Sequence, residues 1–291
     1  MSSDVMPMTE PRPRRQRSQS SGATDAALLF DEPGPRGRIL IAIGSVVAVI
    51  GIAALAAAVL YRLDLAGQLD YPKWRYFLGQ SVVSQLLEAA GTTLTLGGVA
   101  AVLTFPLGIA LGWLRLLDNR PIRWLVGLWI DAMRAVPMLL LVYFFLLVVP
   151  RFATISDFWK LALPIVMCTS ATTAEVFRSG VRALDRGQTE AAWALGMSPS
   201  LTMRLILAPQ ALRLMLPTLI TQMVTIIKGT TLAYVLAYPE LMYRGSTVIG
   251  QAKIDAHLSV FFQTYVIIAV AYIIVNWALG ALARYIESRT R

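Results

Sequence analysis

The sequence predicts an all-α integral membrane protein, and three observations support this fold class. Hydrophobic residues make up 56% of the 291 positions, and charged residues make up only 15%. The mean hydropathy of +0.62 is rarely reached by a water-soluble domain of this size. The apolar residues also gather in six runs, most of them near the length that a helix needs to cross about 30 Å of hydrocarbon.

The amino-terminal part is expected to contain a tail and one extra helix. Residues 1–38 are polar and rich in Pro, Ser, Gly and Arg, which predicts a disordered cytoplasmic tail. The apolar run Ile39–Leu60 is too long for the core of a signal peptide, so we expect an additional, uncleaved transmembrane helix at 39–60. The alanines from Ala54 to Ala58 resemble a cleavage site, and cleavage there is the alternative.

The remaining chain is predicted to hold a surface-lying segment and five spans. Residues 72–90 carry aromatic side chains, Trp74 among them, that suit an interfacial amphipathic segment on the outer side. In the first of the five spans, Gly108 and Gly112 form a pair of small residues that would let a neighbouring helix approach closely. The five expected spans are Gly91–Leu114, Trp124–Val149, Leu161–Phe177, Leu214–Val235 and Val260–Leu282.

The distribution of basic residues predicts the orientation. With the amino terminus in the cytoplasm, 17 of the 26 Lys and Arg residues fall on the cytoplasmic side and 7 on the outer side. This asymmetry follows the positive-inside rule and places both termini of a multi-pass protein in the cytoplasm. It also accounts for the formal charge of +9 without a nucleic-acid partner.

The chain has too few cysteine and histidine residues for several kinds of functional site. Cys168 is the only cysteine and His257 the only histidine, so an internal disulfide, a cysteine-based structural metal site and histidine catalysis are not expected. No G-x-x-x-x-G-K-[ST] motif is present, so a phosphate-binding loop of that type is absent. We therefore predict no catalytic residue, metal or cofactor in this chain.

The loop between the fourth and fifth of the six spans is well specified. Gln188–Leu195 contains helix-forming residues, and Gly196 can end that helix in a left-handed conformation. Ser198 can cap a second helix, with Pro199 at its first position, and Pro209 ends or kinks that segment. The loop thus predicts a short helix, a tight turn and a second helix.

Three interpretations of this loop compete. A DNA-reading helix-turn-helix has the same pattern, but a loop tethered at both ends to membrane spans could hardly enter a major groove. A docking element would present Ala191, Ala192 and Leu195 to a groove on a cytoplasmic partner. A purely structural loop is the remaining possibility.

The same loop carries a family resemblance. Glu190, Ala191 and Ala192, with Gly196, Ile206 and Pro209 at fixed spacing, resemble the EAA loop of binding-protein-dependent ABC importer permeases. Ala208 departs from the leucine that the family usually places before the proline.

Other stretches extend the resemblance over roughly residues 88–286. They are similar to segments of polar amino acid permeases of the histidine, glutamine and glutamate type, and most like glutamate permeases. These stretches are Met133–Pro137, Ala174–Arg178, Gly187–Gln188, Lys228–Leu232 and Glu240–Leu241.

The resemblance implies a fold, a function and a set of partners. It implies a type I ABC importer permease core of about five helices at 91–286, with a cytoplasmic coupling loop at 185–210 and the extra amino-terminal helix. The implied function is a transport subunit, rather than an enzyme, in the inner or plasma membrane of a prokaryote. Its partners would be two ATPase subunits that bind ATP and Mg, a second permease subunit, either a sister chain or a second copy, and an extracytoplasmic amino acid-binding protein. Coupling would run through the EAA-loop residues, namely Glu190, Ala191, Ala192, Leu195, Gly196, Ile206 and Pro209.

A polar stripe inside an apolar helix marks a candidate substrate path. Thr218, Thr221, Gln222, Thr225 and Lys228 recur at steps of three and four residues, so they share one helix face. Hydrocarbon penalises such a face, so we expect it to line a watery path or a permease–permease seam.

Further charged residues within the spans leave alternatives open. Arg134 and Glu175 are also candidates for the path, but Lys228 could instead pair with Glu175 or Glu240 as a structural bridge. Asp131 with Arg134, and Glu175 with Arg178, could form intrahelical ion pairs.

Two other functions remain open from the sequence. An ion-coupled secondary amino acid transporter would use the buried charges to carry protons. A membrane anchor for a signalling partner would use the loop at 185–210 for docking alone.

Overall fold

The computed structural model describes residues 34–290, and this part is helical with no β-strand. Most of the predicted tail lies outside the described residues. The chain divides into two units, of which the first ends at Leu65 and the second begins at Ala66. Each unit is described by itself.

The described part of the first unit is one helix, α2 (Pro35–Leu65). Its apolar side chains are exposed all round, and its length and composition suit a membrane span. The expected helix at 39–60 is therefore present, but it begins within the predicted tail and continues to Leu65. A helix that is apolar on every side is stable in lipid, because no face needs a polar surrounding.

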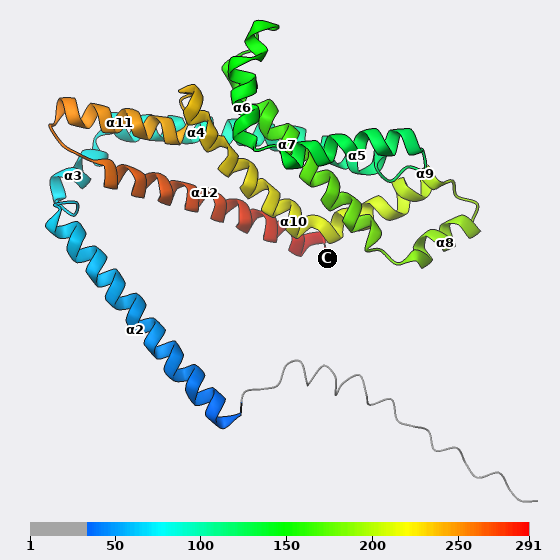
Figure 1. Ribbon diagram of the computed structural model, residues 1–291, viewed down its shortest axis with the longest axis horizontal. Coiled ribbons are helices and arrows are strands. Elements are labelled where there is room, and N and C mark those ends of the chain that lie inside the picture. Colours follow the sequence, from blue (N-terminus) through cyan, green and yellow to red (C-terminus); the bar gives the residue numbers. More distant parts are fainter. Residues whose placement is uncertain (1–33, 291) are drawn as a thin grey trace, which may run out of the picture. The chain divides into compact units, whose positions relative to one another are not determined.

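The second unit consists of helices and short helical turns (Figure 1). In chain order they are α3 (Tyr71–Arg75), η1 (Tyr76–Leu78), α4 (Gln80–Leu114), α5 (Arg120–Ala135), α6 (Met138–Leu147), η2 (Val149–Arg151), α7 (Asp157–Arg182), α8 (Arg186–Ala194), α9 (Pro199–Thr202), the π-helical segment η3 (Met203–Leu207), α10 (Ala208–Gly229), η4 (Thr230–Leu236), α11 (Leu241–Asp255) and α12 (Phe261–Thr290).

Helix α7 forms the centre of the second unit. It packs against α4, α5, α6 and α10. The glycines Gly108 and Gly112 of α4 lie against the α7 backbone, which confirms the predicted close approach. Buried hydroxyls also join the two helices, since Thr104 and Thr169 share a hydrogen bond of 2.9 Å.

The expected span Leu161–Phe177 lies within α7, many of whose residues are buried by neighbouring helices. Among the described residues, four helices are long and apolar enough to span a membrane, and the bent pair of α5 and α6 makes a fifth. Helix α7 is not one of them, because its apolar stretch is interrupted by polar residues. Thr169, Ser170 and Thr173 are among these residues; they are buried, and their hydroxyls bond to the helix's own backbone carbonyls.

Two expected elements differ from the structure. The expected span Trp124–Val149 is broken between α5 and α6, which meet at 96° (Figure 1). Pro137 follows an extended Val136, because a proline lacks the backbone N–H and disfavours helix in the preceding residue. The expected surface segment at 72–90 is not a separate unit, because the chain breaks at Gly79 and residues 80–90 already belong to α4.

Candidate functional site

The predicted coupling loop has the predicted local structure. The side chain of Asp185 caps α8 by accepting a hydrogen bond from the Gly187 amide at 2.7 Å. Gly196 ends α8 with a positive φ of 76°. The amide of Met197 donates to Ala192, and that of Gly196 to Trp193, the hydrogen-bond pattern of a Schellman turn.

The second half of the loop leads directly into a spanning helix. The Ser198 hydroxyl accepts from the Leu201 amide, and Pro199 occupies the first turn of α9. The π-helical segment η3 follows, and Pro209 lies in the first turn of α10. A hydrogen bond of 3.2 Å from Gln210 to Gln188 ties α10 to α8. Helix α8 is thereby linked to α10 through both the chain and a side-chain contact.

The exposed surface of α8 differs from the expected one. Ala192 is only 1% exposed and therefore cannot be presented to a partner, because α8 packs on α9 and η3 through its inner face. Leu195, at 81% exposed, and Trp193, at 56%, are the exposed apolar side chains at the carboxyl-terminal end of α8, and Glu190 and Ala191 are exposed as well. Trp193 also lines a pocket with Pro199 and Leu207 in the second half of the loop. Of the other predicted coupling residues, Ile206 is half-buried and Pro209 is exposed.

The polar stripe of α10 is largely exposed. Thr221, Thr225 and Lys228 are exposed, whereas Gln222 is half-buried. The two threonine hydroxyls donate to backbone carbonyls one turn earlier. The opposite face of α10 packs inward through Ile226 and Ile227. The stripe is thus free to meet another surface.

Lys228 pairs with neither of the two carboxylates that the sequence offered as alternative partners. Among residues 34–290, Lys228 makes no ion pair. Glu175 binds arginines, and Glu240 accepts hydrogen bonds from Tyr243 and Tyr272. Both candidate carboxylates are therefore occupied elsewhere.

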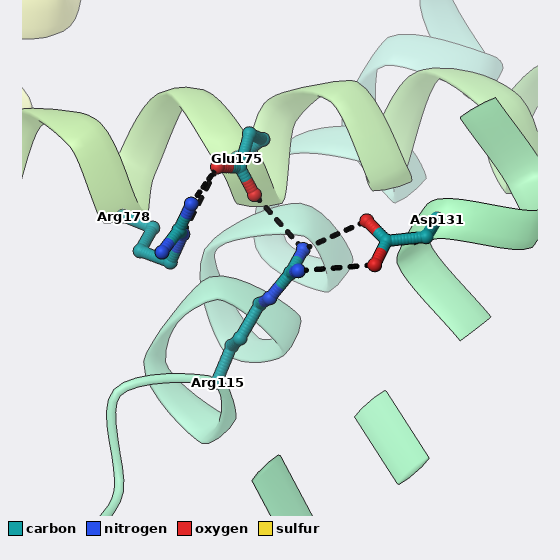
Figure 2. Close-up of polar contacts among 4 residues, drawn as sticks. All are labelled: Arg115, Asp131, Glu175 and Arg178. Atoms are coloured by element: carbon teal, nitrogen blue, oxygen red, sulfur yellow. Dashed lines mark hydrogen bonds and ion pairs between the residues drawn. The ribbon is translucent and has the colours of Figure 1, made fainter. Parts of the chain in front are cut away.

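A four-residue ion-pair network joins the ends of three helices (Figure 2). Arg115, just after α4, contacts Asp131 of α5 at 3.2 Å and Glu175 of α7 at 2.9 Å. Glu175 also pairs with Arg178 one turn on, as predicted. The expected pair of Asp131 with Arg134 is wrong, because Arg115 takes that carboxylate and Arg134 stays exposed.

Sequence reasoning missed the role of Arg115. Its place at the end of an apolar span was visible, and so were two carboxylates near the ends of the following helices. Nothing in the sequence indicated that these ends meet, because α5 and α7 are brought to α4 by packing alone.

Comparison with known proteins identifies the family. The family model described as "Binding-protein-dependent transport system inner membrane component" matches residues 104–291. The chain belongs to this family. It is a multi-pass membrane permease component of a transport system, not an enzyme.

Curated relatives match much of this permease. It is 32% identical over 198 residues to the probable glutamine ABC transporter permease protein GlnP of Bacillus subtilis, covering 68% of this chain and 89% of the relative. It is 34% identical over 230 residues to the glutamate transport system permease protein GluD of Corynebacterium glutamicum, covering 77% and 82%.

Solved structures share the fold of the permease. An amino acid ABC transporter crystallised with histidines matches with a TM-score of 0.64 at 24% identity, over 72% of this chain and 95% of that chain. The MetNI methionine ABC transporter in an inward-facing conformation matches with a TM-score of 0.62 at 16% identity, over 73% and 99%. The all-α fold of a type I importer permease is therefore confirmed.

A buried carboxyl and the backbone amide that follows it hold α11 against two other helices of the permease. Glu240 is 0% exposed. One of its oxygens accepts from the Tyr243 amide at 2.9 Å and caps α11, while the other accepts from Tyr272 of α12 at 3.0 Å. The next amide, of Leu241, donates to Thr93 of α4. Burial raises the pKa of Glu240, since water is excluded from it.

Proposed function

We propose that this permease forms the translocation path for a polar amino acid, with glutamate favoured, in an ATP-driven importer. The observation that carries this proposal is the exposed stripe with Lys228 on an otherwise apolar helix. Such a face is unfavourable against lipid, so it lines a polar path or meets a second permease subunit. The names of the relatives support glutamate or glutamine as the substrate.

The proposed assembly supplies what this chain lacks. Two cytoplasmic subunits bind ATP and Mg, and an extracytoplasmic binding protein delivers the amino acid. A second permease subunit, a sister chain or another copy, completes the path. Both termini of this chain lie in the cytoplasm, in keeping with the distribution of basic residues.

Coupling is proposed to run through α8. Leu195 and Trp193 would dock in a groove of the ATPase, as an exposed apolar helix face does in many partner grooves. ATP-driven movement of α8 would then pass to α10 through Gln188, Gln210 and the short α9–η3 connection. The result is a rigid-body switch between outward- and inward-open states.

The first test removes the charge from the stripe. In vesicles containing the complete importer, Lys228→Met should lower glutamate uptake about tenfold and lower glutamine uptake less, because a charge-assisted contact contributes about 1.5–3 kcal/mol. Lys253→Met, which removes an exposed lysine from α11, is the matched control. Equal loss for every amino acid, together with loss of assembly, would assign Lys228 a structural role.

The second test strains the α8 turn. A Cβ at Gly196 meets no atom within 4 Å, so Gly196→Val acts through its positive φ alone. Uptake and transport-linked ATPase activity should fall while membrane insertion persists. Gly196→Asn should retain both activities, since asparagine tolerates this conformation. Normal uptake by the valine variant would contradict coupling through this turn.

The rival function is an ion-coupled secondary transporter. It predicts that this chain alone accumulates amino acids in vesicles when an ion gradient is imposed. The importer predicts no accumulation until the ATPase subunits, the binding protein and ATP are added.

A further inference from the structure

A cavity rich in arginine lies along α5, beside the ends of α4 and α7. Its volume is about 540 Å³, and Trp124, Leu128 and Asp131 are among the residues that line it. We refer to it as the arginine cavity, and its arginines are Arg115, Arg120, Arg123, Arg178 and Arg182. None of these arginines takes part in the proposed transport path or in the proposed coupling loop.

The carboxylates near the arginine cavity neutralise only part of its charge. Asp131 and Glu175 pair with Arg115 and Arg178. Within residues 34–290, the other three arginines of the cavity make no ion pair. Several guanidinium groups facing one space form a site for an anion with several oxygens, because each presents a planar fork of N–H donors.

The surface beside the cavity is apolar. On α5, Trp124 is 66% exposed, Leu125 58% and Leu128 55%, whereas Ile130 is buried. Tryptophan is enriched at the boundary between membrane and water. The arginine cavity therefore lies beside exposed apolar side chains of α5, at the end of α7 that leads into α8.

We propose that the arginine cavity binds the phosphate of an anionic phospholipid, with the acyl chains along the apolar face of α5. Basic pockets between membrane helices are suited to such headgroups. The exposed apolar side chains favour a lipid over a soluble anion, because acyl chains would cover Trp124 and Leu125, whereas a soluble anion would leave them exposed. The bound lipid would hold α5 in place at the Arg115–Asp131 ion pair.

The test measures lipid binding to the full-length chain by native mass spectrometry. Phosphatidylglycerol should bind more tightly than phosphatidylcholine, whose headgroup carries no net charge. Arg120→Gln with Arg123→Gln should weaken phosphatidylglycerol binding about 30-fold, which corresponds to about 1 kcal/mol for each arginine. The double variant with lysine at both positions should retain most of the binding. Retained binding would show that the glutamine variant loses lipid because it loses positive charge, not because it misfolds.

A matched control removes two exposed arginines elsewhere. Arg213→Gln with Arg284→Gln lowers the net charge equally but leaves the cavity intact, so phosphatidylglycerol binding should not change. Equal loss in both double variants would overturn the proposal, since it would reflect net charge alone.

Two further outcomes identify other occupants and would also overturn the proposal. Inorganic phosphate that displaces the lipid at equal concentration would make the cavity a site for soluble anions. In the complete importer, measured in the same way, loss of the ATPase subunits from the Arg120/Arg123 glutamine variant with lipid binding unchanged would make the arginines a protein interface. Retention of lipid in excess inorganic phosphate, with the ATPase still bound, supports the lipid.

Discussion

The packing of α4 on α7 gives a sharp prediction about Gly112. A Cβ built at Gly112 would lie 2.6 Å from the backbone carbonyl oxygen of Ala174 and 3.0 Å from the Phe177 ring. Ordinary van der Waals contact begins at about 3.4 Å. The carbonyl belongs to the central helix and cannot turn aside as a side chain would. Gly112→Ala therefore has to push α4 and α7 apart.

The expected magnitude combines two opposing effects. Overpacking in a well-packed interior costs about 1–3 kcal/mol. Alanine is a better helix former than glycine by about 1 kcal/mol, which offsets part of that cost. Gly112→Ala should therefore lower the free energy of unfolding by up to about 2 kcal/mol relative to the natural protein, and by about 1–3 kcal/mol relative to a Gly→Ala change that gains helix propensity without overpacking. For a domain of about 200 residues the second difference corresponds to a Tm lower by about 2–12 °C.

The assay is thermal unfolding of the purified chain in detergent, with a matched variant in the same helix. A Cβ at Gly98 of α4 meets nothing within 4 Å, so Gly98→Ala should leave the Tm unchanged or raise it. If Gly112→Ala were as stable as Gly98→Ala, the close approach of the two helices would be refuted.

Two further predictions concern buried charge. A double-mutant cycle between Arg115 and Glu175, whose side chains are 17% and 20% exposed, should give a coupling energy of about 1–3 kcal/mol. A cycle between Arg115 and Asp131, whose side chain is 59% exposed, should give less than about 1 kcal/mol, because water screens that pair. Equal coupling energies in the two cycles would contradict this ranking. Because burial raises the pKa of Glu240 in the folded chain, its contribution to stability is fully present below about pH 4.3 and is lost as the pH rises through the folded pKa. Acidification should therefore stabilise the natural protein relative to Glu240→Gln, as measured by Tm against pH. The same dependence of Tm on pH in both proteins would contradict this reasoning.

Local features of the loop at 185–210 were predictable because they depend on neighbouring residues. Asp185 was not singled out as a cap, yet the helix, the left-handed turn at Gly196 and the Ser198–Pro199 start all follow from rules that act within a few positions. The orientation of α8 was not predictable. Burial of Ala192 depends on the packing of α8 on α9 and η3, which residue types alone do not specify.

The sequence by itself determined that this protein is a helical membrane protein, that α10 carries a polar stripe, and that its loop resembles the coupling loop of importer permeases. These properties follow from composition, from the period of the helix and from short-range turn chemistry. Tertiary structure alone decided that α7 lies at the centre, that Arg115 rather than Arg134 binds Asp131, and that Lys228 has no carboxylate partner in the described part of the chain. The physical reason is that an ion pair between helices forms only where the ends of those helices meet. Close packing of α4, α5 and α7 brings Arg115 to Asp131, 16 residues further along the chain, and to Glu175, 60 residues further along.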